Sequence, residues 1–170
     1  MKIFYLITLS LISFSSFSMN NSLQEQVQKQ LELNRDLGIA AQTGNLFDVI
    51  RLIEEGADPV STSMLANQGG STPLFKAAWA GHLEVVTYLV GCGANINELD
   101  ASFGINPFHA ACMEGRLEVV KFLAQNGADI HMLDKRGNNA YYLAERRAHD
   151  NIQKFIYKFD EEQFNAQKKK

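Results

Sequence analysis

The sequence predicts an all-α protein, a solenoid of about four stacked helix-turn-helix units, because three short segments recur along it in step. Copies of the first segment, Gly-x-Leu, begin at Gly44, Gly81 and Gly115. Copies of the second, Gly-Ala-Asp/Asn, begin at Gly56, Gly93 and Gly127. Copies of the third, Pro-x-x-x-Ala, begin at Pro73 and Pro107. The intervals of 37 and 34 residues each mark one unit, and such units bury their apolar faces by stacking on one another.

The composition is that of one ordinary domain. The 170 residues are 46% hydrophobic and 21% charged, with a net charge of −3, 12 glycines, three prolines and two cysteines. These values exclude a collagen-like or proline-rich disordered chain, a disulfide scaffold and a general attraction to nucleic acid. No apolar run reaches the roughly 18 to 20 residues that a transmembrane helix needs. Composition alone leaves both an enzyme and a binding protein open.

Residues 1–18 have the pattern of a secretory signal peptide. Lys2 precedes the apolar stretch 3–14, and the small residues Ser16 and Ser18 stand where cleavage before Met19 requires them. We therefore expect export, to the periplasm or out of the cell, and no membrane association after the signal is removed. The alternatives are an uncleaved membrane anchor, for which the apolar stretch is short, and a buried strand.

Residues 19–36 are predicted to form an N-terminal capping helix. Ser22 and Glu25 have the spacing of a capping box, and Leu23, Val27 and Leu31 follow at helical intervals. We expect this apolar stripe to shield the open end of the solenoid, because a stack of repeats needs a cap there. The alternative is an independent helix that binds a partner.

The four predicted units have one internal plan, which is clearest in the second. Thr72 and Pro73 are an N-cap and a first-turn proline, and Gly81 ends the helix that they begin. An apolar stripe then marks a second helix, which Gly93 ends. The predicted units are residues 37–66, 67–99, 100–133 and 134–163, and residues 164–170 are a basic tail.

Two segments, Thr72-Pro73-Leu74 and the Pro-Phe-His-Ala-Ala run at 107–111, complete a pattern that resembles ankyrin repeats over about residues 37–160. The resemblance implies helix pairs joined by β-turn fingers, with a first finger lengthened within 59–66. The outer units depart from the pattern, as terminal repeats do. The last one lacks the proline and has Ala148 where glycine is usual.

No signature of catalysis stands out, so we expect neither an enzyme nor a cofactor or metal site. His109 and Cys112 lie three residues apart on one helix and could suggest a reactive or metal-binding pair. The resemblance instead gives His109 a structural hydrogen bond between units. Cys92 and Cys112 are predicted to be free thiols, although an oxidising compartment would permit a disulfide.

Ankyrin repeats imply that inner helices and finger tips bind another protein. The candidate contact residues are Lys76, Trp79, Ala80, Phe103, Ile105, Ala110, Met113, Glu114, Arg146 and Arg147. Among them we expect Trp79 and Met113 to form an apolar anchor and the two arginines to supply charge, since tryptophan and arginine are enriched at binding hot spots. The alternative is that Trp79 covers a neighbouring unit and the arginines are only solvated.

Charge is uneven along the chain. Residues 19–134 carry 6 basic and 14 acidic side chains, whereas residues 135–170 carry 9 basic and 5 acidic ones. A polarised surface could orient a charged partner. We therefore expect an exported monomeric module that binds an unidentified protein and no nucleic acid. A scaffold, an inhibitor or immunity protein and a secreted effector all remain open as its role.

Overall fold

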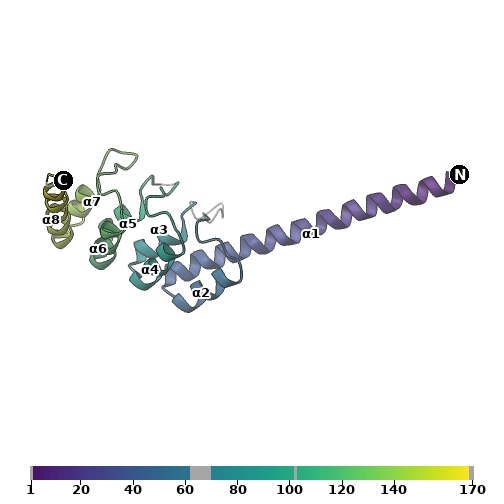
Figure 1. Ribbon diagram of the computed structural model, residues 1–170, viewed down its shortest axis with the longest axis horizontal. Helices are drawn as coiled ribbons and strands as arrows, with labels where there is room; N and C mark the ends of the chain where they lie inside the picture. Colours follow the sequence, from purple (N-terminus) through teal and green to yellow (C-terminus); the bar gives the residue numbers. More distant parts are fainter. Residues whose placement is uncertain (1, 62–69, 102, 169–170) are drawn as a thin grey trace.

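The computed structural model describes residues 2–61, 70–101 and 103–168, with side chains from Asn21 onward (Figure 1). These residues form eight α-helices and no β-strand, in agreement with the all-α prediction. The helices are α1 (Lys2–Thr43), α2 (Leu46–Glu54), α3 (Pro73–Ala80), α4 (Leu83–Gly91), α5 (Pro107–Met113), α6 (Leu117–Gln125), α7 (Ala140–Arg146) and α8 (Asp150–Gln167). Within this part of the chain, no helix is both long and apolar enough to span a membrane.

The helices stack as antiparallel pairs in two rows. The end of α1 and then α3, α5 and α7 contact one another in one row, and α2, α4, α6 and α8 form the second. The described parts of the loops that lead from each second helix to the next first helix project from one side of the stack (Figure 1). This arrangement confirms the predicted solenoid. The lengthened first finger falls largely on residues 62–69, outside the described residues.

The first helix of each later unit begins at a polar N-cap. The side chains of Thr72, Asn106 and Asn139 accept hydrogen bonds from backbone N–H groups three residues ahead, at 3.1, 2.9 and 2.9 Å. Each bond satisfies a donor that the helix start leaves unpaired. The fourth unit therefore keeps the capping chemistry of the others, although it lacks their proline.

The main core lies between the two rows. Its largest members, among them Leu74, Leu89, Phe108, Leu123 and Ile152, are fully buried. Neighbouring units are also joined by a repeated polar contact. His82, Arg116 and His149 reach the backbone carbonyls of Gln42, Trp79 and Met113 in the preceding unit, at 3.0, 3.2 and 3.1 Å. These bonds fix the ends of the first helices relative to one another.

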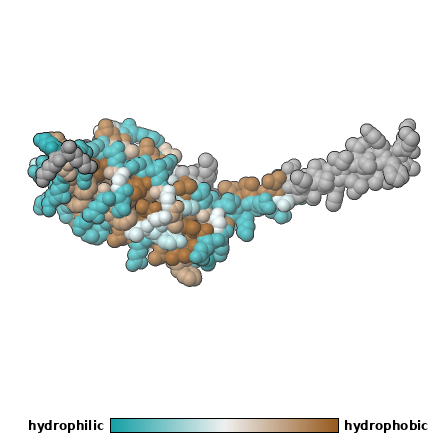
Figure 2. Space-filling view, viewed as in Figure 1, coloured by the Kyte–Doolittle hydropathy of each residue, from teal (hydrophilic) through white to brown (hydrophobic). Residues whose placement is uncertain are grey.

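The predicted shielding by the N-terminal stripe is wrong. Helix α1 runs through Ser22, which is therefore no N-cap in the whole chain, and projects from the stack (Figure 1). Leu23, Val27 and Leu31 are 55, 56 and 52% exposed. Helical periodicity shows that one face of a helix is apolar, but it does not show what packs against that face. Figure 2 shows this apolar surface on the projecting part of α1.

The open end is covered instead by the following part of α1. Leu33 packs against the core, and Leu37 is fully buried. Gln30 donates to the Gly56 carbonyl at 2.9 Å, and Asn34 accepts from the Asp58 N–H at 2.8 Å. At the other end, α8 continues into the segment expected to be a basic tail, with Lys168 as its C-cap.

Candidate protein-binding groove

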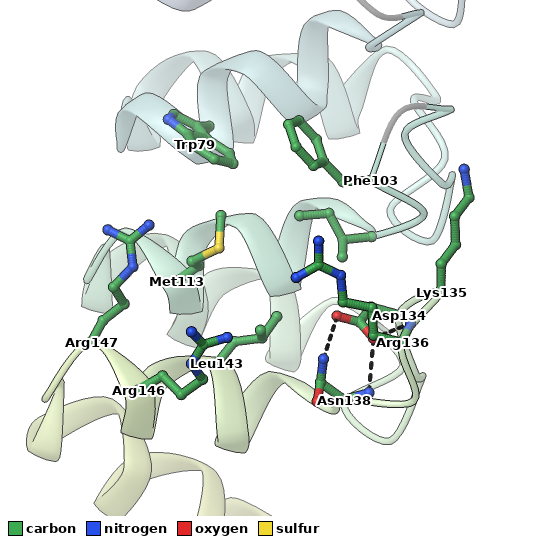
Figure 3. Close-up of a pocket in the computed structure, with 11 residues that line it drawn as sticks. Trp79, Phe103, Met113, Asp134, Lys135, Arg136, Asn138, Leu143, Arg146 and Arg147 are labelled. Atoms are coloured by element: carbon green, nitrogen blue, oxygen red, sulfur yellow. Dashed lines mark hydrogen bonds between the residues drawn. The ribbon is translucent and has the colours of Figure 1, made fainter.

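A groove of about 460 Å³ lies along the first-helix row, where α3, α5 and α7 meet two of the fingers (Figure 3). Its lining residues are Trp79, Phe103, Ile105, Met113, Asp134, Lys135, Arg136, Asn138, Leu143, Arg146 and Arg147. Three of the four units contribute to it. The volume falls in the range of roughly 300 to 1,000 Å³ that is typical of ligand pockets.

One wall of the groove is aromatic. Trp79, at the end of α3, lies 6.2 Å from Phe103 of the next finger between ring centroids, with 27° between the ring planes. The ring centroid of Phe75, one turn earlier on α3, lies 6.0 Å from that of Trp79. Phe103 is 58% exposed, whereas Trp79 is half-buried. The wall therefore combines a held indole with a phenyl ring that is open to solvent.

The floor is a second apolar cluster, separate from the main core. Phe75, Ile105 and Ala110 are its buried members, and Trp79 and Met113 pack against them. The cluster is small, and three of its members, Trp79, Ile105 and Met113, line the groove. Its partly buried members therefore leave some apolar surface open in the groove.

The opposite wall carries positive charge. It contains Lys135, Arg136, Arg146 and Arg147. Lys135 donates from Nζ to the Ala101 carbonyl at 2.6 Å, and Arg147 lies 3.9 Å from a Glu114 carboxylate oxygen. Among the residues that the structure describes, no carboxylate lies within ion-pair distance of Arg136 or Arg146. Figure 3 shows both side chains extending into the groove.

Asp134 is the acidic residue of the lining, and its carboxylate is used within its own finger. One oxygen accepts hydrogen bonds from the N–H groups of Arg136 and Asn138, both at 2.8 Å, and the other accepts from the Asn138 amide at 3.0 Å (Figure 3). Desolvation would raise the pKa of Asp134, but these bonds outweigh it and lower the pKa below its ordinary value. Asp134 thus holds the finger that presents Arg136.

A second hollow of about 370 Å³ adjoins the groove across the aromatic wall. It is lined by Gln42, Ser71, Phe75, Lys76, Trp79 and Phe103. Lys76 is buried, and its ammonium packs against α1, where a Cβ on Gly38 would lie only 3.0 Å from Nζ. Burial lowers the pKa of Lys76. Trp79 and Phe103 therefore separate two hollows and are accessible from both.

Six of the ten residues that the sequence suggested line the groove: Trp79, Phe103, Ile105, Met113, Arg146 and Arg147. Lys76 lines the adjoining hollow. The other three, Ala80, Ala110 and Glu114, lie outside both linings, and Ala110 is a fully buried member of the floor cluster.

The sequence reasoning missed Asp134, Lys135, Arg136, Asn138 and Leu143. The excess of basic residues from position 135 onward was a usable signal for Lys135 and Arg136.

His109 and Cys112, which the sequence suggested as a possible reactive or metal-binding pair, are both buried in the structure. His109 approaches Asn106 Oδ1 through Nδ1 at 2.6 Å and the Met132 carbonyl through Nε2 at 2.8 Å, so it ties α5 to the following finger. Burial lowers the pKa of His109 and raises that of the Cys112 thiol, so neither group is activated. Cys92 and Cys112 are free. Within the described part of the chain, no three His, Cys, Asp or Glu side chains are placed to hold a metal ion.

Comparison with known proteins identifies the repeat. A family model for ankyrin repeats in three copies matches residues 16–100 and 92–168. No curated protein matches the chain. Together the two matched ranges cover both the helix rows and every element that lines the groove.

Proposed function

Because the chain belongs to the ankyrin-repeat family, whose members are generally protein-interaction modules, we propose that it is an exported module that binds another protein through the groove. Trp79 carries this proposal. It is the sole tryptophan of the sequence, it is only half-buried, and it stands at the boundary between two hollows. Tryptophans in such positions are frequent hot spots, and their loss can cost about 2 kcal/mol or more of binding energy.

In this proposal the module acts by binding its partner and catalyses no reaction itself. The carbonyls of Trp79 and Met113 accept hydrogen bonds from Arg116 and His149 of the following units, so the backbone that presents these side chains is held in place. A surface that is already ordered loses less conformational entropy on binding. The partner is held, masked or positioned by this surface.

Export rests on the sequence of residues 1–18, with its short apolar stretch and its serine cluster. The direct test is fractionation of the producing cells, followed by mass measurement of the recovered protein. Loss of the first 18 residues from protein outside the cytoplasm supports export. Full-length protein that stays in the cytoplasm contradicts it.

The binding face is tested by photo-crosslinking within the producing cells. A photoreactive phenylalanine analogue replaces Phe103 in the groove or, as a matched control, Phe47 on α2, which is 75% exposed. We expect position 103 to capture a defined protein and position 47 to capture none. Trp79→Ala should weaken the capture at position 103.

Two outcomes would contradict binding through the groove. One is equal capture at positions 103 and 47, and the other is capture at position 103 that Trp79→Ala leaves unchanged. The identity of the captured protein then separates the roles. A resident complex indicates a scaffold, an enzyme that loses activity when bound indicates an inhibitor or immunity protein, and a protein of another cell indicates an effector.

A further inference from the structure

We propose that the groove recognises an acidic segment of its partner, in which an apolar side chain is flanked by carboxylates. The inference rests on the proposed function and specifies its partner. It follows from the two unlike walls of the groove. The aromatic wall of Trp79 and Phe103 faces the basic wall across a space that one large side chain and its neighbours can fill.

Charge selects the chemistry of the segment. The lining has four basic residues and one acidic residue, and the carboxylate of that residue, Asp134, is already bonded by its own finger. Arg136 and Arg146 extend into the groove without a carboxylate partner among the described residues. A guanidinium group binds a carboxylate through two parallel hydrogen bonds, which makes arginine selective for such groups.

The apolar floor selects the centre of the segment. Ile105 is buried, and Met113 and Trp79 are half-buried above it. An aromatic or long aliphatic side chain placed there would cover the apolar surface that these residues leave open. The methionine can adjust to side chains of different shape, since it is unbranched and flexible. The charged flanks would then lie against Arg136 on one side and Arg146 on the other.

A protein segment fits the charge distribution better than a nucleic acid does. The basic wall belongs to the last unit, whereas residues 19–134 carry 14 acidic and 6 basic side chains. A long polyanion would extend from the groove over this acidic body, where it would be repelled. A short acidic segment would contact the basic wall only.

A second copy of this chain fits less well. Its most acidic exposed stretch is 160–162 on α8. Asp160 already lies 3.1 Å from His131, and Glu162 lies 3.7 Å from Lys158 of the same helix. These groups would have to leave their present partners to reach the groove.

The test is a random-peptide display library selected on the purified full chain. We expect the selected peptides to be enriched in Asp and Glu around one aromatic or long aliphatic residue. Selection on an Arg136→Glu, Arg146→Glu double variant should lose this enrichment. Selected peptides that are neutral or basic, or an absence of selected peptides, would overturn the inference while leaving photo-crosslinking at position 103 as an independent test of the proposed function.

Affinity measurements with one selected acidic peptide complete the test. In fluorescence anisotropy, Arg146→Glu should weaken binding by about tenfold or more, and added salt should weaken binding to the unaltered protein. Lys154→Glu makes the same charge change on α8, outside the groove lining, and should leave the affinity within about twofold. Equal losses in the two variants would show that only net charge matters and would contradict a specific site.

Two further measurements test a nucleic acid and a second copy of the chain as alternative ligands of the groove. A single-stranded oligonucleotide that binds more tightly than the peptide would overturn a protein segment as the ligand. Sedimentation of the purified chain should show a monomer at concentrations where the peptide binds. A dimer that the peptide dissociates would make the second copy the occupant instead.

Discussion

Helices α3 and α5 bury apolar residues on two faces, and the two faces differ in what covers them. Leu74 and Phe108 point into the main core between the helix rows and are completely buried. Trp79 and Met113 belong to the small groove cluster on the other face and are only partly buried. The same two helices thus have one side closed by the fold itself and one side that borders the groove. Under the proposed function, we expect this difference to separate residues that determine stability from residues that determine binding.

The largest effect is expected on the core face. Phe108→Ala removes a fully buried ring at the centre of the stack, and such a truncation costs about 3 to 5 kcal/mol of unfolding free energy because it leaves a cavity. Chemical denaturation followed by circular dichroism should show this loss, or a chain that no longer folds. A loss below about 1 kcal/mol would show that the two faces do not differ in stability.

Trp79→Ala tests the groove face, where we expect a large effect on binding and a small effect on stability. The ring is half-buried and contacts Phe75 and Phe103 at the groove edge, so the stability cost should be clearly smaller than that of Phe108→Ala. Binding should fall by about 2 kcal/mol or more, measured with the captured partner or a selected peptide. A variant that unfolds like Phe108→Ala would give Trp79 a structural role instead, in line with the alternative that it covers a neighbouring unit.

The core face was predictable from the sequence, whereas half of the groove was not. Repeat spacing and helix caps are local signals, so Thr72, Pro73 and Gly81 identified the bounds of α3 directly. Arg136 lies 57 positions from Trp79 in the sequence, and only the fold brings the two residues to one groove. Variable positions could be found on the helices, but the position of the finger between α6 and α7 depends on how Asp134 holds it.

The N-terminal stripe shows the opposite limit. Leu23, Val27 and Leu31 have a strong local pattern, yet they are exposed because the helix continues past the stack. Helical spacing describes the helix itself, and burial depends on what else the chain places nearby. Asn139 is the converse case. It caps α7 as Thr72 caps α3, although the last unit lacks the proline that follows Thr72.

A smaller effect on stability is expected when the pH is lowered, because His109 then becomes protonated. Burial lowers the pKa of His109, which joins α5 to the finger that carries Arg136. In the unfolded chain, histidine has a pKa of about 6.5 and takes up a proton first. The stability contribution of neutral His109 is therefore complete above pH ~6.5 and is lost as the pH falls from there towards the lower folded pKa.

The measurement is the urea unfolding free energy at pH ~7.5 and pH ~5, a range that stays above the titration of Asp134. His109→Asn removes the titrating group, and the other three histidines remain as the internal control. We expect the variant to lose less stability between the two pH values than the unaltered chain does. An unchanged pH dependence would assign the effect to the other histidines.

The smallest effect is expected directly behind the basic wall. Ala148 ends the turn after α7 with a φ of 58°, a left-handed conformation that alanine adopts at a cost. Ala148→Gly relieves this strain and also makes the unfolded chain more flexible, so we expect a net stabilisation of only about 0.5 kcal/mol. Thermal unfolding checks the sign of this change.

Because Arg146 and Arg147 immediately precede this turn, the peptide affinity of Ala148→Gly distinguishes two cases. If the core holds α7, affinity stays constant while stability rises. If the strained turn itself orients the arginines, affinity falls although the fold is more stable, and the groove would then depend on backbone strain that the core face does not share.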